Sequence, residues 1–153
     1  GYFMDHLLTK IPMIRMDGIV GDVIDSDSLL YFTDRRDTAR KVASLYLEKQ
    51  YYGRSKIEMY NEKKTLRQAV EIIAEKLKMK HLHYIRFSDD EYRNYLVTKG
   101  VSVSFANIYL ETAHAISMGA MTPIHIDTNV PNLPKSVSEY IDTVFVPTFT
   151  SGM

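Results

Sequence analysis

The sequence predicts a single α/β domain over residues 1–153, built of short strands and about five helices. Two observations predict this class. Strand-like segments alternate with segments of helical periodicity between Leu29 and Gly100. Most of the helical segments also begin at a recognisable capping residue. A length of 153 residues suits one domain and is too short for two ordinary ones.

The helices are predicted where apolar residues recur at helical spacing between start and stop signals. The expected segments are residues 34–52, 65–77, 88–100 and 104–118, and a short helix that begins at residue 136. Asp34, Thr65 and Ser88 are the N-cap candidates of the first three. The apolar stripe of the first helix consists of Ala39, Val42, Ala43, Tyr46 and Leu47. The stripe of the second consists of Leu66, Ala69, Val70, Ile73 and Leu77, and that of the fourth of Phe105, Ile108, Tyr109, Thr112, Ala113 and Ile116.

Three short strands are predicted between these helices, over residues 29–33, 56–60 and 81–87. The second and third alternate polar and apolar residues, as half-buried strands do. Residues 122–134 are polar and contain three prolines, so we expect an ordered surface loop there. So few strands predict an α/β fold without a complete doubly wound sheet.

Composition excludes several classes of function. Lys plus Arg and Asp plus Glu both number 19, which leaves no basic surface for nucleic acid or an anionic membrane. The chain has no Cys, so disulfides, thiol catalysis and all-cysteine metal sites are excluded. No apolar run approaches the roughly 20 residues of a membrane-spanning helix, and the N-terminus lacks the pattern of a signal peptide. We therefore expect a soluble cytoplasmic protein without nucleic-acid or membrane partners.

The sequence contains no glycine-rich loop for a bound dinucleotide. Neither G-x-G-x-x-G nor G-x-x-x-x-G-K-[ST] occurs, and the closest pair of glycines, Gly18 and Gly21, has the wrong spacing. Such loops need glycine because their backbone N–H groups must approach the phosphates closely. We therefore predict no cofactor in this chain, and neither tight nicotinamide binding nor oxidoreductase turnover by the chain alone.

Three further patterns favour structural roles. His81 and His83 share one face of a predicted strand, but no third ligand lies at useful spacing, so we predict no metal site. Tyr95 and Lys99 reproduce the Tyr-x-x-x-Lys pair of short-chain dehydrogenases on a predicted helix, where an amphipathic surface pair is favoured over catalysis. Asp37 lies in the first turn of its helix, where the helix dipole favours a carboxylate; this structural role is favoured over one in which Asp37 or Arg36 is buried and fixes the strand–helix junction.

Several segments, taken in order, resemble one protein family. They are residues 1–6 (Gly-Tyr-Phe-Met-Asp-His), 32–39 (Phe-Thr-Asp-Arg-Arg-Asp-Thr-Ala), 53–60 with 65–77, 83–100, 116–119 and 133–141. In this order they resemble the NmrA-like atypical short-chain dehydrogenases, and in particular the branch of the type 2 NAD(P)H:quinone oxidoreductases and the triphenylmethane reductases. The similarity covers only the C-terminal half of the family; its Rossmann half, with the glycine fingerprint, would precede Gly1.

The resemblance implies the substrate-binding lobe of an enzyme whose full-length relatives use NADP or NAD to reduce quinone-like or aromatic compounds. Residues 1–8 and 118–123 would line the substrate side, and His6 stands where the family usually has Asn. The implied substrate-binding residues are Tyr2, Phe3, Met4, His6, Met118 and Met121. Methionine and aromatic side chains pack adaptably against flat ligands. The alternative is a non-catalytic module that binds a small ligand or a protein; a metal-dependent hydrolase would require a metal at His81 and His83.

A chain without the Rossmann half is expected to expose strand edges and apolar surface, which favour association. Residues 11–16, 19–23 and 144–149 are apolar without a clear period, and they are the candidate surfaces. We therefore expect a homodimer or a higher homo-oligomer.

Overall fold

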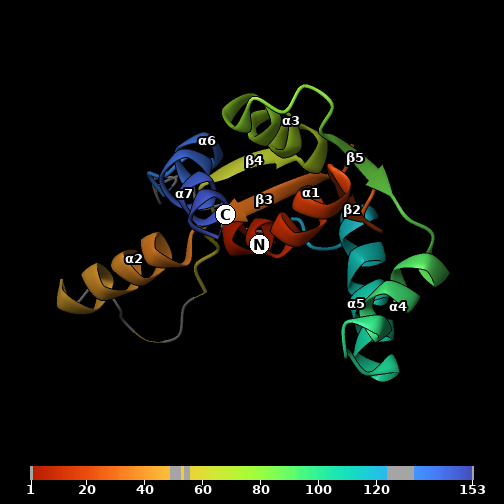
Figure 1. Ribbon diagram of the computed structural model, residues 1–153. Helices are drawn as coiled ribbons and strands as arrows, with labels where there is room; N and C mark the ends of the chain where they lie inside the picture. Colours follow the sequence, from red (N-terminus) through yellow and green to blue (C-terminus); the bar gives the residue numbers. More distant parts are fainter. Residues whose placement is uncertain (1, 49–52, 54–55, 124–132, 153) are drawn as a thin grey trace.

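The computed structural model describes residues 2–48, 53, 56–123 and 133–152. Its strands are β1 (Tyr2–Phe3), β2 (Ile19–Asp22), β3 (Leu29–Thr33), β4 (Glu62–Thr65) and β5 (His83–Arg86). Its helices are the 3₁₀ helix η1 (Met4–Lys10), α1 (Ile11–Asp17), α2 (Arg35–Leu47), α3 (Leu66–Leu77), α4 (Asp89–Thr98), α5 (Val103–Ser117), α6 (Val137–Tyr140), the π-helical turn η2 (Ile141–Phe145) and α7 (Val146–Ser151). The expected α/β class is confirmed (Figure 1).

Two small sheets carry the strands. In one, β1 pairs with β3 in parallel and β3 pairs with β4 in antiparallel fashion. In the other, β2 pairs with β5 in parallel. Figure 1 shows α3 across the top of the molecule beside β4, and α4 and α5 together below β2 and β5. The helix α2 extends away from the body on the opposite side.

The starts predicted for the first three helices and for the short helix at residue 136 are confirmed, because capping is a local property of the sequence. The fourth helix begins at Val103 with Ser102 as its cap, and not at the predicted residue 104. Asp34 accepts a hydrogen bond from the backbone N–H of Arg36 at the start of α2. Thr65 and Ser88 each form a complete capping box, at the starts of α3 and α4. The predicted face of α3 is also correct, since Leu66, Ala69, Val70 and Ile73 are buried in the core. The end predicted for the first helix lies partly outside the described residues.

The strand predictions are correct for two of three segments. β3 coincides with residues 29–33, and β5 lies within residues 81–87. The strand expected over residues 56–60 is wrong, since that segment is irregular and β4 follows it. Pairing with β3 decides the position of β4, because Leu29 lies opposite Thr65 and Phe32 lies opposite Glu62. Of the loop expected over residues 122–134, residues 124–132 lie outside the described part of the chain.

The three segments proposed as association surfaces are core instead. Residues 11–16 lie mostly in α1, residues 19–23 contain β2, and residues 144–149 run through η2 into α7. Their buried side chains include Ile14, Val20 and Phe145, all at or near zero exposure. The predicted interfaces are therefore wrong. Elements this short show no readable period, although long-range packing buries them.

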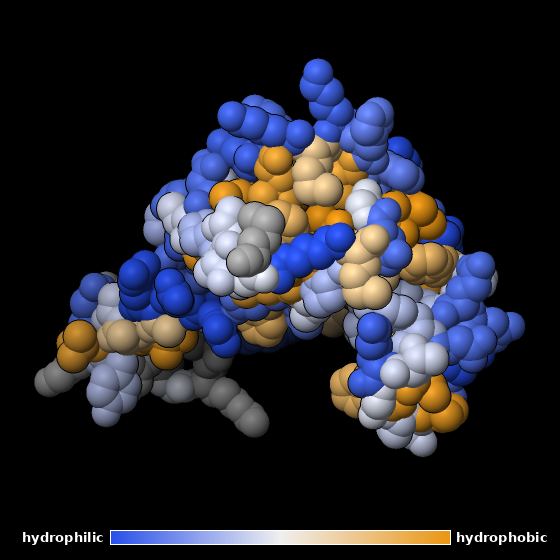
Figure 2. All heavy atoms as spheres, viewed as in Figure 1, coloured by the Kyte–Doolittle hydropathy of each residue, from blue (hydrophilic) through white to orange (hydrophobic). Residues whose placement is uncertain are grey.

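The apolar surface that is exposed lies on α2 and α5. The stripe predicted on α2 exists, but Val42 and Leu47 are 54% and 79% exposed. On α5, the buried residues are Ala106, Leu110 and Ala113, while Phe105 is 60% exposed. Figure 2 shows apolar residues on both of these projecting parts. Among the described residues, no helix is long and apolar enough to cross a membrane.

Candidate functional site

A cavity of about 210 Å³ lies between the N-terminal segment and one side of α5. It is lined by Tyr2, His6, Ile24, Phe105, Ile108, Tyr109, Thr112, Ala113, Ile116 and Met121. We call it the aromatic cavity. None of the described residues that line it is a lysine, arginine, aspartate or glutamate, so this wall favours an uncharged ligand with a flat apolar body.

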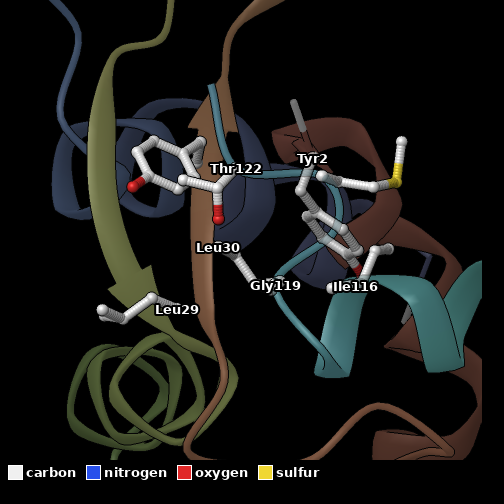
Figure 3. A pocket seen from close by; sticks show the side chains of 8 residues that line it. Tyr2, Leu29, Leu30, Ile116, Gly119 and Thr122 are labelled. Atoms are coloured by element: carbon white, nitrogen blue, oxygen red, sulfur yellow. The ribbon is translucent and has the colours of Figure 1, made fainter. Parts of the chain in front are cut away.

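A smaller hollow of about 20 Å³ adjoins the aromatic cavity and shares Tyr2, Ile116 and Met121 with it. Figure 3 shows this hollow, with the Tyr2 side chain extending toward Ile116 at the end of α5 and with Leu30 of β3 nearby. Tyr2 therefore lines both spaces. A change in the position of its ring would alter the volume of both.

Strand pairing places the Tyr2 ring. β1 pairs with β3 so that Tyr2 lies opposite Phe32, and the two rings meet edge to face at 5.3 Å between centroids. The chain then turns into η1, which brings the His6 ring to 5.1 Å from the Tyr2 ring. Within the described part of the chain, His6 is the one imidazole in the wall of the aromatic cavity.

Burial is the largest influence on His6, and it lowers the pKa of the imidazole, because the charged form loses hydration. The nearby Lys10 ammonium lowers this pKa further. His6 is therefore a neutral imidazole at pH 7, with one N–H donor and one acceptor nitrogen. Such a group can donate a hydrogen bond to a carbonyl oxygen of a ligand without bringing a charge into the cavity.

A buried ion pair lies behind the wall of the aromatic cavity. Asp22, at the end of β2, has no exposed surface, and its Oδ2 accepts hydrogen bonds from Lys10 Nζ at 2.5 Å and from the Tyr109 hydroxyl at 2.9 Å. Lys10 Nζ also donates to the carbonyl oxygen of Gly21 at 3.0 Å and to the Tyr92 hydroxyl at 3.1 Å. All three ammonium protons thus have acceptors, as a buried charge requires. This network joins η1, β2, α4 and α5.

The network is a fixed scaffold rather than a proton shuttle. Burial alone would lower the pKa of Lys10, but Asp22 and two tyrosines outweigh it and raise that pKa. Burial, with the charge of Asp22, raises the pKa of Tyr109. Both groups therefore hold their protons throughout the neutral range. The buried network acts on the aromatic cavity by holding Tyr109 in place.

The structure brings three of the six predicted site residues together. Tyr2, His6 and Met121 line the aromatic cavity. Met4 is fully buried in the core, and Phe3 and Met118 are exposed outside the lining of the cavity. Phe3 and Met4 differ from Tyr2 and His6 because neighbouring residues of an extended or 3₁₀ segment face different sides.

The residues that sequence reasoning missed lie mainly on α5. Phe105, Ile108 and Tyr109 belong to the predicted stripe, but they line a cavity where a core contact was expected. The sequence does hold a signal for this, since α5 is apolar on two sides. Ala106 and Leu110 form a second stripe, and it is this stripe that packs in the core, which leaves Phe105 and Ile108 to line the cavity. Lys10 and Asp22 carried no signal, since they are 12 positions apart and meet only in the fold.

Asp37, His81 and His83, three other residues singled out from the sequence, lie outside the lining of the aromatic cavity. Asp37 is buried, contrary to the favoured expectation, while Arg36 is exposed; Asp37 Oδ2 accepts from Asn61 Nδ2 at 2.7 Å and from the backbone N–H of Lys135 at 3.0 Å. His81 and His83 are exposed. No cluster of three possible metal ligands occurs within the described part of the chain.

Comparison with solved structures identifies the fold. The chain superposes on an NADPH-dependent quinone oxidoreductase from Escherichia coli in complex with NADPH, with a TM-score of 0.76 and 16% identity over 95% of this chain. A nucleoside-diphosphate-sugar epimerase from Staphylococcus aureus gives a TM-score of 0.73 at 14% identity over 92% of this chain. The triphenylmethane reductase of a Citrobacter species, in complex with NADP(H), gives 0.64 at 18% identity over 99% of it.

This chain spans about half the length of each of these proteins: 51%, 49% and 50%, respectively. No protein-family model matches the sequence, and no curated protein matches it. The resemblance seen in the sequence is thus confirmed at the level of the fold. The half-length coverage agrees with the expectation that the chain corresponds to one half of such a protein.

Proposed function

We propose that this chain is the C-terminal, substrate-binding portion of an NAD(P)H-dependent oxidoreductase that acts on quinone-like or aromatic compounds. The observation that carries the proposal is the aromatic cavity, set in half of a fold that solved NADPH-dependent oxidoreductases share. A small quinone suits this cavity, because it is flat and uncharged. Its carbonyl oxygen can accept a hydrogen bond from the neutral imidazole of His6.

The residues present do not fit a nicotinamide dinucleotide. Asp34, Thr65 and Ser88 occupy the strand-to-helix turns before α2, α3 and α4, where a phosphate loop would have glycine. Each side chain already accepts backbone N–H groups of its own helix, and Asp34 adds a negative charge. The proposal therefore requires that another portion of polypeptide supplies the nucleotide-binding site, so that this chain is inactive alone.

The exposed apolar surfaces support this requirement. Phe105, Ile108 and Met121 line the aromatic cavity and are also largely exposed, so the mouth of the cavity is open. Val42 and Leu47 on α2 are exposed as well. Surface of this kind is typical of an interface that another polypeptide covers. We propose that a nucleotide-binding half covers it in the complete enzyme, and that the isolated chain forms a homodimer.

The test is a titration of the chain with 1,4-naphthoquinone, followed by calorimetry. We expect saturable binding at one site, and a loss of affinity of at least tenfold in Ile108→Asp, which places a charge in the cavity wall. Val103→Asp is the matched control, because Val103 is an exposed apolar residue of the same helix outside the cavity lining. Equal weakening in both variants, or no saturable binding, would contradict the proposed site.

A second measurement separates binding from catalysis. The purified chain with NADPH and naphthoquinone should show no NADPH oxidation at 340 nm. Turnover by this chain alone would contradict the requirement for a nucleotide-binding half. The alternative, a non-catalytic ligand-binding module, is favoured by the absence of a glycine-rich loop from the sequence. It predicts quinone binding that no added nucleotide-binding half converts into turnover.

A further inference from the structure

A second cavity, of about 190 Å³, lies between the N-terminal helices and α4. It is lined by Thr9, Lys10, Met13, Tyr92, Tyr95, Leu96 and Lys99, and we call it the lysine cavity. Among the described residues, its lining shares none with that of the aromatic cavity. Two contacts link the cavities: Asp22 binds both Lys10 and Tyr109, and the Tyr92 and Tyr109 rings stack at 5.4 Å between centroids.

The lysine cavity carries positive charge. Lys10 and Lys99 both line it, and none of the described lining residues is an aspartate or glutamate. Asp22 balances the charge of Lys10 from behind the wall. Lys99 Nζ lies 5.6 Å from the centroid of the Tyr95 ring, and it forms no ion pair with a carboxylate of the described residues. One ammonium group is therefore left for an anionic ligand.

The Tyr92 side chain belongs both to the wall of the lysine cavity and to the buried network. It is only 4% exposed, and its hydroxyl oxygen accepts a hydrogen bond from Lys10 Nζ. The Tyr109 hydroxyl, whose own proton goes to Asp22, is a further hydrogen-bond partner of the Tyr92 hydroxyl. Tyr92 therefore contributes its ring to the cavity, and the Lys99 ammonium is the group left for an anion.

The remaining wall is aromatic and apolar. The Tyr92 and Tyr95 rings lie 5.8 Å apart between centroids, at an angle of 34°. Met13 and Leu96 complete this side of the cavity. A flat ring can pack against such a wall, with the adaptable methionine side chain filling the remaining space.

From these groups we propose that the lysine cavity binds a small aromatic carboxylate, whose ring packs on Tyr95 and whose carboxylate meets the Lys99 ammonium. The pairing of Tyr95 with Lys99 thereby has a binding role in place of the surface pairing that the sequence favours. A carboxylate with a charge-assisted contact gains more than a neutral group of the same shape. The site is independent of the proposed oxidoreductase function.

The experiment uses benzoate as the probe, with binding measured by calorimetry and located by amide chemical shifts. We expect saturable binding with shifts in residues 9–13 and 92–99, and affinity at least tenfold lower for benzamide, the neutral analogue. Lys99→Gln should lower benzoate affinity by a similar factor. Lys80→Gln is the matched control, because Lys80 is exposed and lies outside the cavity lining.

Three outcomes would overturn the proposal: no saturable benzoate binding, equal affinity for benzoate and benzamide, or unchanged affinity in Lys99→Gln. Displacement of naphthoquinone by benzoate would also contradict the proposal, because both ligands would then bind in the aromatic cavity. Tyr95→Leu keeps an apolar wall without the ring and tests the packing step separately. We expect it to weaken benzoate while naphthoquinone binding stays unchanged.

Discussion

The buried tyrosines and Lys10 make this protein sensitive to alkaline pH. Burial raises the pKa of Tyr2, Tyr92 and Tyr109, and Asp22 raises the pKa of Lys10 against the opposing effect of burial. A group whose pKa is higher in the folded chain stabilises the fold fully below its unfolded pKa, here about 10. That contribution is lost as the pH rises toward the folded pKa, because the unfolded chain releases the proton first.

The size of the effect follows from linkage. Each such group lowers the free energy of unfolding by about 1.4 kcal/mol per pH unit once the pH exceeds its unfolded pKa. The four groups named above together give about 4–6 kcal/mol per pH unit, and Tyr84 and Tyr140, whose pKa burial also raises, act in the same direction. A domain of this size has a total stability of about 5–15 kcal/mol. The protein should therefore unfold cooperatively within about one to three pH units above pH 10.

Tyrosinate absorbance tests this expectation, since the chain has 11 Tyr and no Trp. The tyrosines with raised pKa are Tyr2, Tyr84, Tyr92, Tyr109 and Tyr140. The tyrosinate absorbance of these five residues should rise only at the pH at which the far-ultraviolet circular dichroism signal is lost. Tyr109→Phe removes one titrating group and should make the transition less steep. A complete tyrosine titration near pH 10 with intact circular dichroism would refute the reasoning.

Three further predictions concern packing and association. Ile73→Ala, in the core face of α3, should cost about 2–5 kcal/mol in a urea melt, and a loss below about 0.5 kcal/mol would show that this face is not packed. Gly21→Ala should cost about 1–3 kcal/mol, because a Cβ there would lie 2.0 Å from Cε2 of Phe87, and Phe87→Leu in the same chain should recover part of that cost. Light scattering of the isolated chain should give twice the 17.7 kDa monomer mass, and Leu47→Lys should reduce it to 17.7 kDa; a wild-type monomer would contradict the dimer.

Local signals were sufficient to predict much of the fold. The caps at Asp34, Thr65 and Ser88 act within a few residues, so they could be recognised without any knowledge of the tertiary structure. The face of α3 was predictable for a related reason, because Leu66 and Ile73 belong to a stripe opposed by polar residues. The α/β class followed from the order of these elements.

Long-range pairing decided what the sequence could not predict. β4 lies where β3 needs a partner, although the alternation of residues 56–60 is clearer than that of Glu62–Thr65. The stripe on α2 was equally readable, yet Val42 and Leu47 are exposed, because the described residues include no element that packs on them. Periodicity identifies an apolar face, but it does not tell whether the same chain covers that face.

The candidate site was the hardest part to predict, because its residues act only in combination. Tyr109 lines the aromatic cavity with its ring and donates its hydroxyl proton to Asp22, while Tyr92 lines the lysine cavity and accepts from Lys10. One buried ion pair therefore positions a wall residue in each cavity. Burying this pair has a high desolvation cost, which its hydrogen bonds offset. Removal of Lys10 would leave Asp22 buried without its counter-ion, and we expect both cavities to change together.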